Sequence, residues 1–145
     1  MQTILLVEDN ELNQDMLRRW LQHWGFQVLV ADDGAAGLTL ARTAHPDLIV
    51  MDINLPVMDG LEATTRLKAA PSTRGIPILV LTAHASIDDR RRSEAAGADE
   101  YETKPVDFAR LRQKILALLA TRAAPDGDCI QDVESRGTNR GLGLG

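Results

Sequence analysis

Short apolar segments alternate along this chain with longer segments in which apolar residues recur every three or four positions. The short segments show no polar alternation, which is typical of strands buried on both faces of a parallel sheet. The longer segments have the spacing of amphipathic helices. The pattern predicts five strands, each followed by a helix, with the strands at residues 3–7, 26–30, 47–52, 78–81 and 98–101.

The first predicted helix carries an apolar stripe that includes Trp20 and Trp24, and the simplest interpretation makes both tryptophans core anchors. Leu12 falls on the opposite, polar side of that helix, where it can contact a partner. Gly25 and Gly97 are expected to end the first and fourth helices, because glycine readily adopts the left-handed conformation found after a helix.

Strands that alternate with helices in short segments imply an α/β fold, with a parallel sheet covered by helices on both faces. The chain has 145 residues, enough for one domain with a core. Periodicity ends near residue 122, and residues 123–145 are rich in Gly, Asp, Arg and Ser. We therefore expect one domain at 1–122 and a flexible tail or linker at 123–145, which can be functional, a spacer or a remnant of cloning.

Composition excludes several classes of function. A formal net charge of −5 and an aromatic content of 3% argue against a nucleic-acid surface or an anionic membrane surface. The single cysteine, Cys129, excludes an internal disulfide framework and fits a reducing compartment. No apolar run approaches the length of a membrane span, and the chain opens directly on a strand, so we expect a cytoplasmic protein with no direct nucleic-acid partner.

Polar residues lie at or directly after the carboxyl ends of several predicted strands. In a parallel sheet these ends share one edge, so topology brings five side chains together: Glu8, Asp9, Asp52, Thr82 and Lys104. Taken singly, each has an ordinary explanation as a helix cap, a turn residue or a surface charge. Their arrival at one edge favours a phosphoryl or metal site.

Three neighbouring carboxylates repel one another unless a cation lies among them or one is protonated. A site that offers only oxygen ligands favours Mg²⁺, which typically bridges one or two carboxylates to a phosphate. Thr82 and Lys104 can hold the oxygens of a phosphoryl group. The constellation around Asp52 therefore predicts attack of a carboxylate on a phosphoryl donor, to give an aspartyl phosphate.

The residues that carry this chemistry lie in motifs that closely resemble the receiver domain of two-component response regulators, of the CheY-like type. The motifs are Val7-Glu8-Asp9-Asn10, Met51-Asp52-Ile53-Asn54-Leu55-Pro56-Val57-Met58-Asp59-Gly60, Leu81-Thr82-Ala83 and Lys104-Pro105. The resemblance covers about residues 3 to 121. It implies a flavodoxin-like (βα)5 fold, doubly wound, with five parallel strands in the order 2-1-3-4-5.

The resemblance also implies roles for individual residues. Asp52 would be the phosphoacceptor, and Thr82 and Lys104 would bind the phosphoryl group. Mg²⁺ would be held by Glu8 (partly through water), Asp9, Asp52 and the main-chain carbonyl of Asn54. Tyr101 would be the switch aromatic, whose ring turns inward when Thr82 moves to the phosphate. Asn54 and His84 lie at positions that tune hydrolysis of the aspartyl phosphate in this family.

A receiver of this kind is a phosphorylation-driven switch rather than a turnover enzyme. It would take its phosphoryl group from a phosphohistidine of a histidine kinase or phosphotransfer protein, and act on a downstream protein target as a monomer or a phosphorylation-dependent dimer. The output surface would span about residues 86–120. The Glu8-Asp9-Asn10 opening, with Asn13, is most similar to receivers of phosphorelays, hybrid histidine kinases and single-domain regulators of cell-cycle type.

Three alternatives remain open from the residues alone. The chain can be the receiver part of a larger response regulator or hybrid histidine kinase. An Asp-nucleophile phosphohydrolase is less favoured, because such enzymes carry a second Asp two residues after the nucleophile, where this chain has Asn54. A degenerate receiver that serves only for docking would be favoured by loss of an acid or of the lysine, and all of them are present.

Overall fold

The computed structural model describes residues 2–55, 58–83 and 87–123. Within these residues, five strands alternate with five helices. The strands are β1 (Thr3–Val7), β2 (Gln27–Ala31), β3 (Leu48–Asp52), β4 (Ile78–Thr82) and β5 (Glu100–Thr103). The helices are α1 (Glu11–His23), α2 (Gly34–Ala44), α3 (Gly60–Ala69), α4 (Ile87–Ala96) and α5 (Phe108–Ala123).

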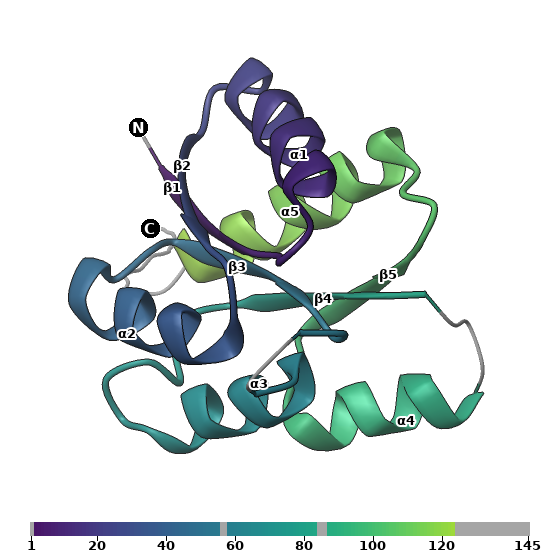
Figure 1. Cartoon of the computed structure of the whole chain (residues 1–145). Helices are drawn as coiled ribbons and strands as arrows, with labels where there is room; N and C mark the ends of the chain where they lie inside the picture. The colour runs from purple at the N-terminus through teal and green to yellow at the C-terminus, as the bar shows by residue number, and fades with distance from the viewer. Residues whose placement is uncertain (1, 56–57, 84–86, 124–145) are drawn as a thin grey trace, which may run out of the picture.

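All five strands are parallel and lie in the order β2-β1-β3-β4-β5, which confirms the predicted flavodoxin-like sheet. Helices α1 and α5 cover one face, and α2, α3 and α4 cover the other (Figure 1). The middle strands β1, β3 and β4 are buried almost throughout, because both of their faces are covered by helices, whereas β2 is only partly buried. Strand β5 is an edge, and within the described ranges β4 is its only neighbour in the sheet.

The core consists of two apolar clusters, one on each face of the sheet. Side chains from β1, β3 and β4 that point one way pack with α1 and α5 around Leu17 and Leu111. The alternate side chains of the same strands pack with α2 and α3 around Leu38 and Leu67. Because successive side chains of a strand point to opposite faces, each of these strands contributes to both clusters.

Helix boundaries follow the expected local chemistry. The side-chain oxygens of Asn10, Asp33 and Asp59 cap α1, α2 and α3 by accepting from main-chain N–H groups in the first turn. Gly25 and Gly97 have φ values of +95° and +98°, so glycine follows α1 and α4 in the left-handed conformation, as predicted.

The predicted fifth strand, residues 98–101, was placed two residues too early, since β5 spans Glu100–Thr103. Asp99 lies in the turn before β5. Its N–H donates to the carbonyl of Ile78 at 2.9 Å, and its carboxylate accepts from the N–H of Ile78 at 2.8 Å. This side-chain contact fixes the turn at Asp99, so that regular pairing with β4 begins only at Glu100.

The prediction that Trp20 is a core anchor is wrong. Its side chain is 41% exposed and its ring stacks on Phe108 of α5, with ring centroids 4.8 Å apart and planes 18° apart. Trp24 is partly buried against the core, closer to expectation. Leu12 is exposed, as predicted from its place on the polar side of α1.

His84 and residues 124–145 lie outside the described residues, so the expectations for that histidine and for the tail stay predictions. None of the helices in the described ranges is long and apolar enough to cross a membrane.

Candidate functional site

The carboxyl ends of the strands bring Glu8, Asp52 and Lys104 into direct contact. Nζ of Lys104 donates to Oδ2 of Asp52 at 3.1 Å and to Oε1 of Glu8 at 3.4 Å. Both carboxylates are buried, whereas the lysine side chain keeps one quarter of its surface exposed (25%). The lysine therefore joins two buried acids to the solvent edge of the sheet.

Asp9 completes an acidic cluster with Glu8 and Asp52. One carboxylate oxygen of each lies within 4.8 Å of the others, with Asp9 exposed at the mouth of the cluster. The other oxygen of Asp52, Oδ1, accepts from the main-chain N–H of Asn54 at 3.2 Å. Both oxygens of Asp52 are therefore oriented, Oδ1 by the following loop and Oδ2 by Lys104.

Thr82 reaches the same edge at the end of β4. It lies opposite Thr103 of β5, and its main-chain carbonyl accepts from the N–H of Lys104 at 2.8 Å. Asp52 lies opposite Leu81, the residue before Thr82, on the neighbouring strand β3. The register therefore sets Asp52, Thr82 and Lys104 on three consecutive strand ends, as the sequence predicts.

Two further residues hold the site in shape. The N–H of Gly60, the first residue of α3, donates to the carbonyl of Ile53 at 2.9 Å, and a Cβ on Gly60 would overlap the main-chain carbonyl of Asp52. The side-chain amide of Gln14 donates to the main-chain carbonyl of Glu8 and, at 2.7 Å, to Asp32. The sequence shows the loop-closing glycine, but nothing in the helical pattern distinguishes Gln14 from other polar residues of α1.

The buried acids and the lysine change one another's proton affinity. Burial is the main cause that raises the pKa of Glu8 from 4.5 to about 7. The charge of Asp52 raises this pKa further, whereas the hydrogen bond from the N–H of Asn10 and the charge of Lys104 lower it. Burial alone would lower the pKa of the Lys104 ammonium, but the hydrogen bond and charge of Asp52, with those of Glu8, raise it above its usual value. Lys104 therefore remains charged at neutral pH, whereas Glu8 gains or loses its proton near neutral pH.

The donor set fits a hard divalent cation. Three carboxylates converge on one point without a histidine or cysteine among them, which is the oxygen-rich environment that Mg²⁺ prefers. A single ammonium offsets only part of their negative charge, so a cation bound among Glu8, Asp9 and Asp52 would relieve the repulsion that remains.

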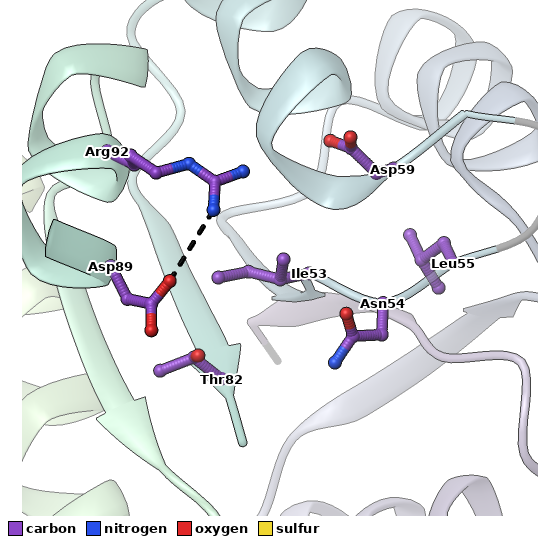
Figure 2. Close-up of a pocket in the computed structure, with 7 residues that line it drawn as sticks. All are labelled: Ile53, Asn54, Leu55, Asp59, Thr82, Asp89 and Arg92. Atoms are coloured by element: carbon purple, nitrogen blue, oxygen red, sulfur yellow. Dashed lines mark hydrogen bonds and ion pairs between the residues drawn. The ribbon is translucent and has the colours of Figure 1, made fainter. Parts of the chain in front are cut away.

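A polar hollow of about 370 Å³ opens next to Thr82. Figure 2 shows Asp89 and Arg92 of α4 on one side and Asp59 on the other, with Ile53 and Asn54 between them. Nη1 of Arg92 lies 3.5 Å from Oδ1 of Asp89. The hollow therefore opens at the edge of the sheet beside Thr82.

Tyr101, the predicted switch residue, lies outside the acidic cluster, on β5. It is opposite Val80, two residues before Thr82 on the neighbouring strand, and therefore faces the same side of the sheet as Thr82. Its ring packs on the core cluster that α2 and α3 cover. Tyr101 therefore lies on the strand next to Thr82 and on the same face of the sheet.

Together these features define a class of protein: a doubly wound α/β domain with an acidic cluster and a lysine at the carboxyl edge of its sheet. The family of response regulator receiver domains matches residues 4–116. This chain therefore belongs to the receiver domain family of two-component signalling, whose members are phosphoacceptor switches.

Individual relatives agree with this assignment. The polar-differentiation response regulator DivK of Brucella ovis is 38% identical over 117 residues, which cover 81% of this chain and 95% of DivK. The transcriptional regulatory protein PrrA of Mycobacterium leprae is 42% identical over 121 residues, 83% of this chain, but the chain spans only 51% of PrrA. The match thus extends over nearly all of one relative and half of the other.

A solved structure gives the same result in three dimensions. The receiver domain of the sensor histidine kinase PA1611 from Pseudomonas aeruginosa PAO1 superposes with a TM-score of 0.77 and 37% sequence identity, over 82% of this chain and 98% of that domain. That crystal structure has a magnesium ion coordinated in its active site cleft.

Proposed function

We propose that Asp52 is the phosphoacceptor of this receiver and that its donor is a phosphohistidine of a histidine kinase or a histidine phosphotransfer protein. The observation that carries the proposal is the contact between Asp52 and Lys104, at 3.1 Å, inside the acidic cluster at the carboxyl edge of the sheet. A carboxylate that accepts a hydrogen bond from an ammonium is held in one orientation, which a nucleophile requires.

In this proposal, a carboxylate oxygen of Asp52 forms a bond to phosphorus while the bond between phosphorus and the imidazole nitrogen of the donor breaks. The electron pair of the broken bond stays on the imidazole. Lys104 and the hydroxyl of Thr82 would hold oxygens of the transferred group, whose charge has to be stabilised during transfer. The N–H of Asn54, which donates to Oδ1 at 3.2 Å, would keep the carboxylate turned toward the donor.

Glu8, Asp9 and Asp52, with the main-chain carbonyl of Asn54, would hold Mg²⁺, as their hard oxygen donors favour. When bound, that ion supplies neutralisation of the phosphoryl oxygens. Support for this assignment comes from the convergence of the three carboxylates and from the magnesium in the cleft of the PA1611 receiver domain.

We further propose that phosphorylation changes the surface formed by α4, β5 and α5 through Thr82 and Tyr101, and that this surface contacts a downstream protein. Thr82 and Tyr101 lie on neighbouring strands and face the same side of the sheet, which supports the coupling. The receiver would comprise residues 1–122, with 123–145 as a tail or linker.

The test is intact mass after incubation with acetyl phosphate, on wild type and on Asp52→Asn. Wild type should gain one labile phosphoryl group in the presence of Mg²⁺, and should gain none after chelation. Asp52→Asn should gain none under either condition. An equal gain on both proteins would remove Asp52 as the acceptor.

A further inference from the structure

Cations from two helices flank the ring of Tyr101. The guanidinium carbon of Arg90, on α4, lies 5.2 Å from the ring centroid. The ammonium of Lys114, on α5, lies 5.4 Å from the same centroid. Since α4 and α5 cover opposite faces of the sheet (Figure 1), this ring is a point where side chains from both helical layers meet. Both contacts are within the range of a cation–π interaction.

Lys114 reaches Tyr101 by way of the open edge of the sheet. Among the described residues no strand pairs with β5 on its outer side, and an edge strand leaves main-chain groups without a partner strand. The ammonium of Lys114 donates to the main-chain carbonyl of Tyr101 at 2.6 Å. The same group therefore binds both the backbone and the ring of this residue.

Glu102 keeps Lys114 in this position. Its side chain is buried on the α5 side of β5, and its Oε1 lies 2.9 Å from Nζ of Lys114. Oε2 accepts from Nη1 of Arg110 at 3.4 Å. A buried carboxylate is costly unless a partner such as an ammonium lies beside it, so Glu102 and Lys114 hold each other at the edge.

We propose that Arg90 and Lys114 stabilise the resting position of the Tyr101 ring, and that Glu102 is a positioning residue that acts through Lys114. We call Arg90 and Lys114 the Tyr101 clamp. The inference rests on the proposed function, in which phosphorylation of Asp52 moves Tyr101. At a partly exposed site, each cation–π contact should raise the population of the resting position, relative to the other position, by a factor of about two to five.

Linkage gives this clamp a measurable effect at the phosphorylation site. Whatever stabilises the resting position of Tyr101 must weaken, by the same factor, the binding of a phosphoryl group that favours the other position. Removing either cation should therefore tighten the binding of a phosphoryl analogue to Asp52, although neither cation belongs to the acidic cluster.

The experiment measures the affinity of the magnesium–beryllofluoride analogue by calorimetry. Arg90→Met and Lys114→Met remove the charge and keep an apolar stem, and each should bind the analogue about two- to fivefold more tightly than wild type. The controls are Arg91→Met and Arg112→Met, which remove the same charge from exposed positions on the same helices. They should bind as wild type does, or more weakly if loss of positive charge disfavours the anion.

A second readout follows the ring itself. Tyr101 is the single tyrosine of the chain, so fluorotyrosine labelling gives one ¹⁹F signal. In the analogue-free form of each clamp variant, this signal should move toward the position it takes in the analogue-bound form of the same variant. In the control variants, the signals of the analogue-free and analogue-bound forms should differ by as much as they do in wild type.

Glu102→Gln tests the positioning role. It should tighten analogue binding in the wild-type background and change nothing in the Lys114→Met background, because its effect passes through Lys114. A residue that only stabilised the fold would act equally in both. Should a change at Glu102 prevent folding, Arg90→Met alters an exposed side chain and still tests the clamp.

The outcomes separate the two proposals. Wild type that neither binds the analogue nor gains a phosphoryl group would overturn the proposed function and the clamp with it. Wild type that does both, with Arg90→Met and Lys114→Met no tighter than their controls, would overturn the clamp alone. A Glu102→Gln effect that persists in the Lys114→Met background would overturn the role of Glu102.

Discussion

Glu8 should make the metal-free protein less stable as the pH rises. Burial raises the pKa of Glu8 to about 7 in the folded protein, from an ordinary value of 4.5. The folded state therefore binds this proton more tightly than the unfolded chain does. The resulting stabilisation is fully present below the unfolded pKa and is lost as the pH rises through the folded pKa.

The size of the effect follows from the two pKa values. The difference between a pKa of 4.5 and one of about 7 corresponds to about 3 kcal/mol. Most of this, about 2 to 3 kcal/mol, is lost between about pH 5 and about pH 8.5. Because Glu8→Gln has no proton to lose, its free energy of unfolding should rise relative to that of wild type by about 2 to 3 kcal/mol across this interval.

Urea unfolding in a chelating buffer, followed by the fluorescence of Trp20 and Trp24, measures both proteins at several pH values. Glu94→Gln, which changes an exposed glutamate of α4, should follow wild type throughout. Addition of Mg²⁺ near pH 8.5 should stabilise wild type more than Glu8→Gln, because a ligand that binds only the folded state stabilises it. A gap between wild type and Glu8→Gln that stays constant with pH would refute the reasoning.

Two further predictions concern the frame of the site and its partner. Gly60→Ala should lower the free energy of unfolding by about 2 kcal/mol or more in urea denaturation, because the new Cβ would overlap a main-chain carbonyl that cannot easily move. The control is Gly75→Ala, which should change stability little because there is open space around that position. Leu12 is 81% exposed in the first turn of α1, the helix that begins directly after Glu8 and Asp9. Leu12→Glu should therefore slow phosphoryl transfer from a phosphohistidine protein by about tenfold, which is the effect of losing about 1.4 kcal/mol of contact. Labelling by acetyl phosphate should stay unchanged. Equal slowing of both reactions would contradict a docking role.

Much of the fold was predictable because its signals are local. Unbroken apolar runs indicate β1, β3 and β4, and these strands lie close to where the sequence places them. Strand β5 was misplaced because its start is set by a contact between Asp99 and Ile78, which lie 21 residues apart. A helical pattern likewise shows that Trp20 is on an apolar stripe, but not that its ring stacks on Phe108 of α5 and stays partly exposed.

The site was predictable for a different reason, which is topology. Once the strands are parallel, their carboxyl ends must share an edge, and Glu8, Asp52 and Lys104 come together without knowledge of any side-chain geometry. The environment of Tyr101 was not predictable in this way. It depends on two features: β5 is an edge strand, so that Lys114 can reach around it, and Glu102 is buried. Both follow from strand order and packing rather than from the spacing of residues in the sequence.

The charges of the site predict an order of events. Above about pH 7, where Glu8 too has lost its proton, three carboxylates and one ammonium leave a formal charge of −3 + 1 = −2 among Glu8, Asp9, Asp52 and Lys104. A phosphoryl donor, itself an anion, is repelled by such a site. With a divalent cation bound to the same carboxylates the sum is zero, and Lys104 no longer has to offset the acids alone. Its ammonium is then available to an incoming phosphoryl oxygen, so the metal should bind before the donor, and labelling of Asp52 should depend on it.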